Sequence, residues 1–221
     1  MTRTGLEKHL RELKNELLEM GSMVEKAIAR AVEALKKRDI EASRQIVEDD
    51  VKINQKRFDL EEKCIELIAT QQPMARDLRE IVSVLHMTVD LERMADHAEG
   101  IARINIRMGD EPLLKPLIDI PRMAQKGIEM THRALQDFID LNVEDARAVC
   151  QADDEVDALY DQVYRELLTY MLQDPRTIQR ATYLLWVSHD LERIADRATN
   201  IAERVVFTAT GKMDEMGVSK Y

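Results

Sequence analysis

Residues that interrupt helices or favour strands are scarce in this sequence. Its 221 residues include seven glycines and five prolines, and aromatic residues make up 4%. Sheet proteins use glycine and proline in their many turns and aromatic residues in their strands. The scarcity therefore excludes a sheet-rich fold, and the abundance of Glu, Lys, Arg, Leu, Ala and Met indicates long helices.

Cysteines and long apolar runs are also rare. The two cysteines, Cys64 and Cys150, lie far apart in the sequence, so neither a disulfide framework nor a thiolate zinc site is expected, and a reducing compartment fits. The longest apolar run, residues 183–187, is much shorter than the roughly 18 residues of a membrane span. The first ten residues lack the apolar core of a signal peptide. We expect a cytoplasmic protein without membrane insertion.

Basic residues are outnumbered by acidic ones, 32 against 42, which gives a net charge of −10. Nucleic acid is therefore not an expected partner, because phosphate backbones are bound by clustered lysines and arginines. The charge is better suited to metal cations or to basic surfaces of partner proteins.

Apolar residues follow a helical period through most of the chain. From Leu6 to Ala34 they recur at alternating spacings of three and four residues, which is typical of a helical bundle. Turn signals at Asp39, Pro73, Gly109 and Asn142 separate further helices. The sequence thus predicts an all-α fold of two tandem three-helix bundles. Their predicted ranges are 5–109 for the first bundle, 110–121 for a linker, 122–210 for the second bundle and 211–221 for a tail.

The two predicted bundles share a duplicated segment. Residues 90–102 read DLERMADHAEGIA and residues 190–202 read DLERIADRATNIA, which match at 9 of 13 positions. A repeat at this spacing indicates that one helical unit has been duplicated.

Each copy of the segment contains a Glu and an Asp four residues apart. These pairs are Glu92 with Asp96 and Glu192 with Asp196. Residues at this spacing share a helix face, where two carboxylates repel each other unless a cation lies between them. One such pair is weak support for a site in a chain this acidic, since a solvated helix face is the more common explanation.

The preceding helices carry matching polar pairs, which makes the pattern more specific. In an antiparallel helical hairpin, residues equidistant from the turn lie side by side, because both helices rise equally per residue. Asp50 and Asp96 lie 23 residues before and after residue 73, and Asn54 and Glu92 lie 19 residues from it. In the second unit, Asp153 faces Asp196 and Asp157 faces Glu192 about the turn at residues 174–175.

We therefore predict two metal sites, one in each unit, at a surface groove between two helices. The ligands are Asp50, Asn54, Glu92 and Asp96 in the first site, and Asp153, Asp157, Glu192 and Asp196 in the second. Oxygen ligands favour divalent or trivalent cations such as iron, manganese, magnesium or zinc. Because Asn54 replaces an acid, the first site is expected to be weaker. Two acidic grooves that bind counter-ions only loosely are the alternative.

Other polar residues near the pairs have simpler interpretations. Arg93 and Arg193 are expected to bridge to nearby acids such as Asp90 and Asp190, and His97 is expected to be a surface residue. Trp186 is expected in the core or at an interface. No nucleophilic triad or glycine-rich phosphate loop is evident in the sequence.

The repeated pieces together resemble the PhoU family. They are Glu-Arg-Met-Ala-Asp at 92–96, Glu-Arg-Ile-Ala-Asp at 192–196, the Asp153/Asp157 pair, and Gln72-Pro73 followed by Asp77-Leu-Arg79. The resemblance covers about residues 5–210. It implies two three-helix bundles related by a pseudo-two-fold axis, paired E/D-x-x-x-D motifs that bind metals, including iron clusters, and a homodimer. Asn54 departs from the motif.

The resemblance also implies a function. Such a protein accompanies the high-affinity phosphate ABC transporter, with the transporter ATPase as a partner at the inner face of the membrane. It represses the phosphate-starvation response through a phosphate-sensing membrane histidine kinase. We therefore expect a regulator that acts by binding and is not an enzyme. A metal-dependent enzyme, a metal-storage bundle and a purely structural bundle are the alternatives.

Overall fold

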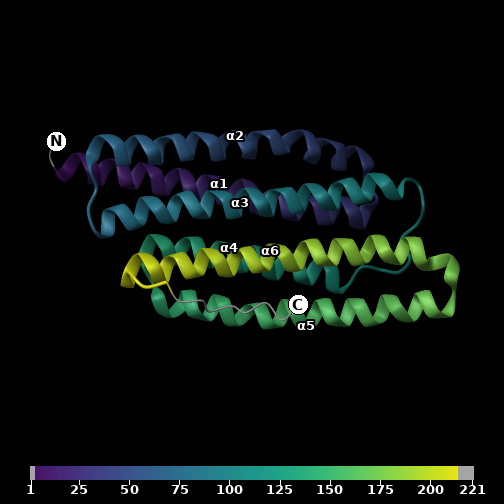
Figure 1. Ribbon diagram of the computed structural model, residues 1–221. Coiled ribbons are helices and arrows are strands. Elements are labelled where there is room, and N and C mark those ends of the chain that lie inside the picture. The colour runs from purple at the N-terminus through teal and green to yellow at the C-terminus, as the bar shows by residue number, and fades with distance from the viewer. Residues whose placement is uncertain (1–2, 214–221) are drawn as a thin grey trace.

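The computed structural model describes residues 3–213, and within this range the regular structure is entirely helical (Figure 1). The predicted tail, residues 211–221, lies mostly outside the described residues. The described chain forms six α-helices and one short 3-10 turn, η1. Their bounds are α1 (Arg3–Lys37), α2 (Ile40–Gln71), α3 (Arg76–Met108), α4 (Asp119–Asp140), α5 (Val143–Gln173), η1 (Pro175–Thr177) and α6 (Ile178–Thr210).

Local sequence signals explain where most helices begin and end. The side chains of Asp39 and Asn142 accept hydrogen bonds from the backbone N–H groups of Ala42 and Asp145, which caps α2 and α5. Gly109 follows α3 with a positive φ of 58°, a conformation that glycine adopts at little cost. These turns lie where the sequence places them.

One boundary differs from the sequence prediction. Helix α4 begins at Asp119, inside the predicted linker, and includes Pro121 in its first turn, where proline costs no helical hydrogen bond. Pro175 begins η1, and α6 starts only at Ile178. The predicted division into two bundles and a linker stays a prediction.

The helices form two layers that meet along α3 and α6 (Figure 1). One layer contains α1, α2 and α3, and the other contains α4, α5 and α6. Helix α3 packs along α6 and α1 along α4, so these four helices form the centre of the molecule. Among the described residues, α2 contacts only α1 and α3, while α5 contacts only α4, α6 and η1. Helices α2 and α5 are therefore the two outer helices.

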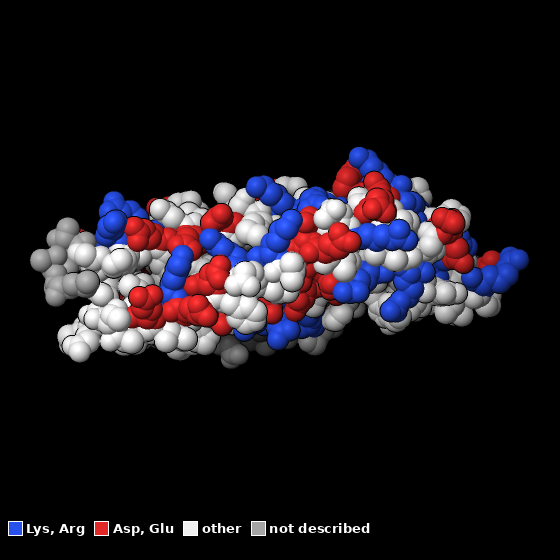
Figure 2. Space-filling model, turned by 90° about the horizontal axis from the view of Figure 1, so that it is seen from above, with Lys and Arg blue, Asp and Glu red and all other residues white. Residues whose placement is uncertain are grey.

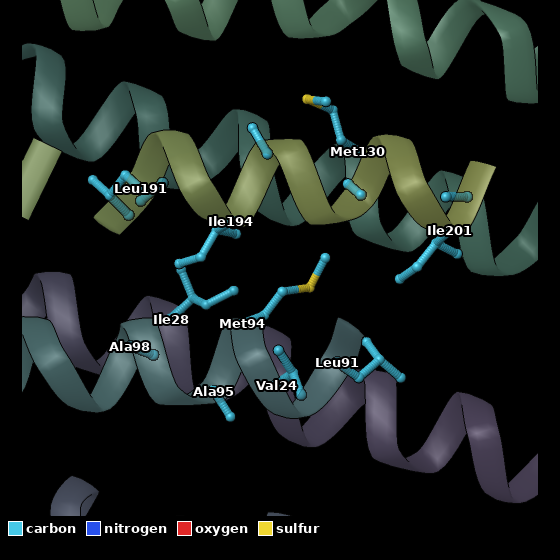
Figure 3. Packing of buried hydrophobic residues seen from close by; sticks show 14 of the residues in the cluster. Val24, Ile28, Leu91, Met94, Ala95, Ala98, Met130, Leu191, Ile194 and Ile201 are labelled. Carbon is cyan, nitrogen blue, oxygen red and sulfur yellow. The ribbon is translucent and has the colours of Figure 1, made fainter. Parts of the chain in front are cut away.

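The hydrophobic core continues across the boundary between the layers. Figure 3 shows Ile28 of α1 and Met94 of α3 directed toward Ile194 of α6, and all three side chains are fully buried. Met94 and Ile194 occupy equivalent positions of the duplicated segment. Gly21 brings α1 close to α4, because a side chain there would collide with Leu135. The two units therefore share one core.

Within residues 3–213, no helix combines the length and the apolar character that crossing a bilayer would require.

The shared core predicts that both layers unfold together. We expect Ile194→Ala to lower the free energy of unfolding by about 2–4 kcal/mol, because it leaves a cavity where the layers meet. Urea unfolding followed by circular dichroism measures this change. Ile178→Ala, on the same helix but 48% exposed, is the matched control and should cost far less. Two separate unfolding transitions would contradict the shared core.

Candidate metal centres

The first predicted site lies between α2 and α3, and its four residues come together as expected from the hairpin. The amide of Asn54 donates a 2.8 Å hydrogen bond to Asp50 Oδ2. Asp96 and Glu92 both act electrostatically on Asp50 across the two helices. Glu92 is only 9% exposed, whereas the other three are half-buried. The site thus extends from the surface into the interface between the helices, deeper than the predicted surface groove.

The second predicted site lies between α5 and α6 and contains four carboxylates. Asp153 lies within electrostatic reach of Asp157, Asp196 and Glu192. Glu192 is 1% exposed, and the others are half-buried. This cluster is therefore at least as buried as the first, and it contains no amide in place of an acid.

Burial and mutual repulsion raise the pKa values of several of these carboxyl groups. Burial, followed by the charges of Asp157 and Asp196, raises the pKa of Asp153 to about 7. Burial and the charge of Asp196 raise the pKa of Glu192 to about 7, although Arg193 opposes the shift. Burial also raises the pKa of Asp50. Without a cation, the ionised clusters are therefore unfavourable in the folded protein.

Several oxygen atoms of the clusters lack a hydrogen-bond partner. In the part of the chain that the structure describes, six buried side-chain atoms have no such partner, and four of them belong to predicted ligands. These four are Asp50 Oδ1, Glu92 Oε2, Asp153 Oδ1 and Glu192 Oε2. Two of the four nevertheless lie beside an arginine, because Arg193 Nε is 2.9 Å from Glu192 Oε2 and Arg93 Nε is 3.5 Å from Glu92 Oε2. Since buried polar atoms are usually paired, Asp50 Oδ1 and Asp153 Oδ1 are the oxygens that fit an added cation.

Arginines are the cations that the structure places at the clusters. At the first, Arg57 Nη1 lies 2.8 Å from Glu92 Oε1, and Arg93 Nη1 lies 3.2 Å from Asp96 Oδ2. At the second, Arg193 Nε lies 2.9 Å from Glu192 Oε2, and its Nη1 lies 2.9 Å from Asp196 Oδ2. Among the described residues, no three acidic, histidine or cysteine side chains converge in metal-binding positions. Binding a metal would therefore require these side chains to rotate.

Three predictions about neighbouring residues hold only in part. Arg93 and Arg193 pair with the motif acids, because those acids lie one residue away or one turn along the same helix. His97 is not a free surface residue: its Nδ1 lies 3.0 Å from Asp190 Oδ1 on α6. Trp186 is not in the core, since it is 46% exposed and its ring packs edge-on against that of Tyr183, with 5.7 Å between ring centroids. Its position at an interface stays a prediction.

The aspartates that precede each motif instead join the two units. Asp90 on α3 accepts hydrogen bonds from Arg197 and Asn200 on α6, at 3.3 and 3.2 Å. Asp190 on α6 pairs with His97 on α3. Because Asp90 and Asp190 are equivalent in the repeat, the two contacts are related by the approximate two-fold axis. They connect the two candidate metal centres across the α3–α6 interface.

Sequence reasoning missed two residues at the first cluster, Arg57 and Glu99. Arg57 bonds to Glu92 as described. Like burial, the charge of Glu99 raises the pKa of Asp50. Glu99 lies seven residues after Glu92, which places both on the same helix face. This spacing is visible in the sequence and could have identified Glu99.

The fold and its carboxylate clusters define an all-helical protein with two tandem repeats, and known proteins share this arrangement. The model of the PhoU domain matches residues 17–104 and again residues 120–205. The crystal structure of PhoU from Pseudomonas aeruginosa is similar, with a TM-score of 0.88 and 36% identity, over 93% of this chain and 99% of that chain. The structure of the phosphate transport system regulatory protein PhoU from Streptococcus pneumoniae also gives a TM-score of 0.88, with 30% identity over 95% and 99% of the two chains.

Curated relatives match over nearly their whole length. A phosphate-specific transport system accessory protein PhoU homolog from Clostridium acetobutylicum is 39% identical over 98% of this chain and 99% of that protein. One from Aquifex aeolicus is 41% identical over 93% of each chain. The chain belongs to the PhoU family. It is thus a homologue of accessory and regulatory proteins of phosphate transport and is not an enzyme.

The raised pKa values predict how the stability of the metal-free protein depends on pH. The Glu192 carboxyl has an unfolded pKa near 4.5 and a folded pKa of about 7, so the folded state binds its proton more tightly. Stability is therefore lost as the pH rises through this range. We expect Glu192→Gln to raise the free energy of unfolding by about 1–3 kcal/mol at pH 8 and by much less at pH 4.5.

Urea unfolding with a chelator at both pH values measures this difference. Glu48→Gln, which removes a carboxylate from the exposed surface of α2, is the control and should show no comparable pH dependence. An equal effect of Glu192→Gln at both pH values would contradict the raised pKa.

Proposed function

We propose that this protein is a cytoplasmic regulator of phosphate homeostasis. It acts on the high-affinity phosphate ABC transporter through the ATPase subunit, and it represses the phosphate-starvation response through the phosphate-sensing membrane histidine kinase. Membership of the PhoU family supports this proposal, as do relatives named for a role in phosphate-specific transport. We also propose that it works as a homodimer.

Metal binding is the second part of the proposal. Each cluster would hold hard cations, of which iron, manganese, magnesium and zinc are the candidates. The observation that carries it is the grouping of carboxylates at equivalent places in both repeats, in which Asp50 Oδ1 and Asp153 Oδ1 are buried without a hydrogen-bond partner. A cation would neutralise carboxylates whose ionised forms are disfavoured, and the arginines now beside them would turn outward to solvent.

Metal binding would also affect the surfaces that partners meet. Each cluster joins an outer helix, α2 or α5, to a central helix, α3 or α6. A cation bound by acids of both helices would link the outer helix to the central one and restrict its movement. The free energy of metal binding would thus be coupled to the exposed surface of the protein.

The first test is metal stoichiometry. The Asp153→Asn, Asp196→Asn double variant removes two carboxylates from the second cluster and should abolish metal binding there while the first cluster still binds. Titration of the chelator-treated protein with Mn²⁺ in a calorimeter measures the number of sites. Glu48→Gln is the control and should bind like the wild type. The metal proposal is wrong if the wild type binds no Mn²⁺, Fe²⁺ or Zn²⁺ above the level of loose counter-ions.

The regulatory role is tested in a bacterial strain that lacks its own PhoU-family protein. At high phosphate, we expect the wild-type gene to restore repression of a phosphate-starvation reporter and the double variant to restore it less well. Immunoblotting checks that both proteins accumulate equally. Equal repression by the wild type and the double variant would show that regulation does not need the second cluster. No repression by the wild type would contradict the regulatory role.

A further inference from the structure

A row of exposed apolar side chains runs along the outer helix α2. Val51, Phe58 and Ile65 are 67%, 51% and 61% exposed, although each is a large hydrophobic residue. They lie seven residues apart, so they follow one stripe on the helix surface. Single exposed apolar residues are common on soluble proteins, whereas a contiguous apolar patch marks an interaction surface. We call Val51, Phe58 and Ile65 the α2 stripe.

The α2 stripe lies on the side of the helix opposite the core. Ile53, Leu60 and Leu67 each follow a stripe residue by two positions, and all three are buried. Two positions correspond to about 200° around a helix. Helix α2 therefore has one apolar stripe covered by α1 and α3 and a second one open to solvent. Figure 2 views the molecule from the α2 side and shows uncharged side chains between the acidic and basic ones.

The two outer helices differ at these positions. At the offset that relates α2 to α5 in the two predicted metal sites, the counterparts of Val51 and Phe58 are Asp154 and Asp161. Helix α5 therefore carries carboxylates where α2 is apolar. An assembly through α2 uses one face of each molecule, so it closes at two copies and does not extend into a chain.

The α2 stripe is symmetric about its central residue. Val51 and Ile65 lie seven residues before and after Phe58. If two α2 helices lie antiparallel about a two-fold axis at Phe58, each Val51 meets Ile65 of the second copy, because both helices rise equally per residue. The two Phe58 rings then meet at the axis. One set of three side chains thus forms a self-complementary surface.

Polar residues beside the stripe fit the same antiparallel arrangement. Gln55 and Glu62 lie three residues before and four residues after the centre of the stripe, so the amide of one copy approaches the carboxylate of the other. Lys52 and Glu66 lie six residues before and eight after it, which brings a cation toward an anion. Lys52 also follows Glu48 by four residues on the same helix, so it can balance both acids.

A parallel arrangement fits less well. It would place Glu61 of one copy beside Glu62 of the other, because both flank the stripe at nearly the same height but on opposite sides. Like charges that face each other across an interface disfavour that pairing. The charges therefore favour antiparallel helices.

We propose that the α2 stripe is the contact between two copies of this protein, which pair antiparallel through α2 about a two-fold axis at Phe58. The inference rests on the proposed homodimer and names the surface that forms it. Helix α2 has 32 residues and is about 48 Å long, so a second copy can contact it well beyond the stripe. The two α5 helices then lie on the outside of the dimer, since each is on the far side of its own molecule from α2 (Figure 1).

Sedimentation equilibrium of the full chain over a range of concentrations tests the proposal. Phe58→Glu should raise the dissociation constant of the dimer by about 30-fold or more, because a central aromatic residue contributes much of the binding energy of an interface. Leu172→Glu, which changes an 85% exposed leucine on α5, is the matched control and should leave the dissociation constant unchanged. Circular dichroism checks that both variants are folded.

Cysteine cross-linking tests the antiparallel arrangement. The native Cys64 and Cys150 are buried, so an added surface cysteine is the accessible thiol. Under mild oxidation, a mixture of Val51→Cys and Ile65→Cys should form a disulfide between the two variants, which mass spectrometry identifies. Val51→Cys by itself should cross-link poorly. Efficient cross-linking of Val51→Cys alone, without the mixed product, would indicate parallel helices and overturn the arrangement.

The failure of this inference can be told from the failure of the homodimer itself. If the wild type dimerises and Phe58→Glu dimerises equally well, the homodimer stands and the α2 stripe is not its contact. If the wild type is a monomer at every concentration, the homodimer fails and the inference fails with it. If, in addition, Phe58→Glu loses repression in the reporter strain while Leu172→Glu keeps it, the stripe binds a different protein and not a second copy.

Discussion

The close packing of α3 against α6 is the contact on which the rest of the molecule depends. Ile28, Met94 and Ile194 bury apolar surface where the two layers meet, and the fully buried positions of the two repeated motifs face each other there. Burial of apolar side chains is the main source of stability in such a bundle. Because the core uses one face of each motif, the acids fall on another face, toward α2 and α5.

The polar contacts at the same interface add specificity to this packing. Asp90 with Arg197, and Asp190 with His97, repeat one contact about the approximate two-fold axis. Partly buried charge pairs contribute little net stability, because desolvation offsets their attraction. They do fix the register of α3 on α6, and they place a charged contact within one helical turn of each carboxylate cluster.

The ionised carboxylate clusters lower the stability of the folded protein. Asp153 and Glu192 have pKa values of about 7, because burial and neighbouring acids disfavour their ionised forms. Arginines offset part of this cost at both clusters. This arrangement suits a site where a metal ion can replace an arginine as the neutralising charge. Neither the arginines nor a metal ion has to bring the carboxylates together. The backbone positions are set by the hairpins in either case.

The sequence by itself determined the helices, the duplication and the four polar positions of each cluster. It could do so because a helix rises by a constant amount per residue, so that distance from a turn predicts which residues face each other. Only the tertiary structure decided that Glu92 and Glu192 are buried, that Arg57 reaches Glu92, and that Glu99 shares a pocket with Asp50. Burial depends on how neighbouring helices cover a face, and arginine partners depend on long side chains that can reach several acids. Neither property follows from spacing along the chain.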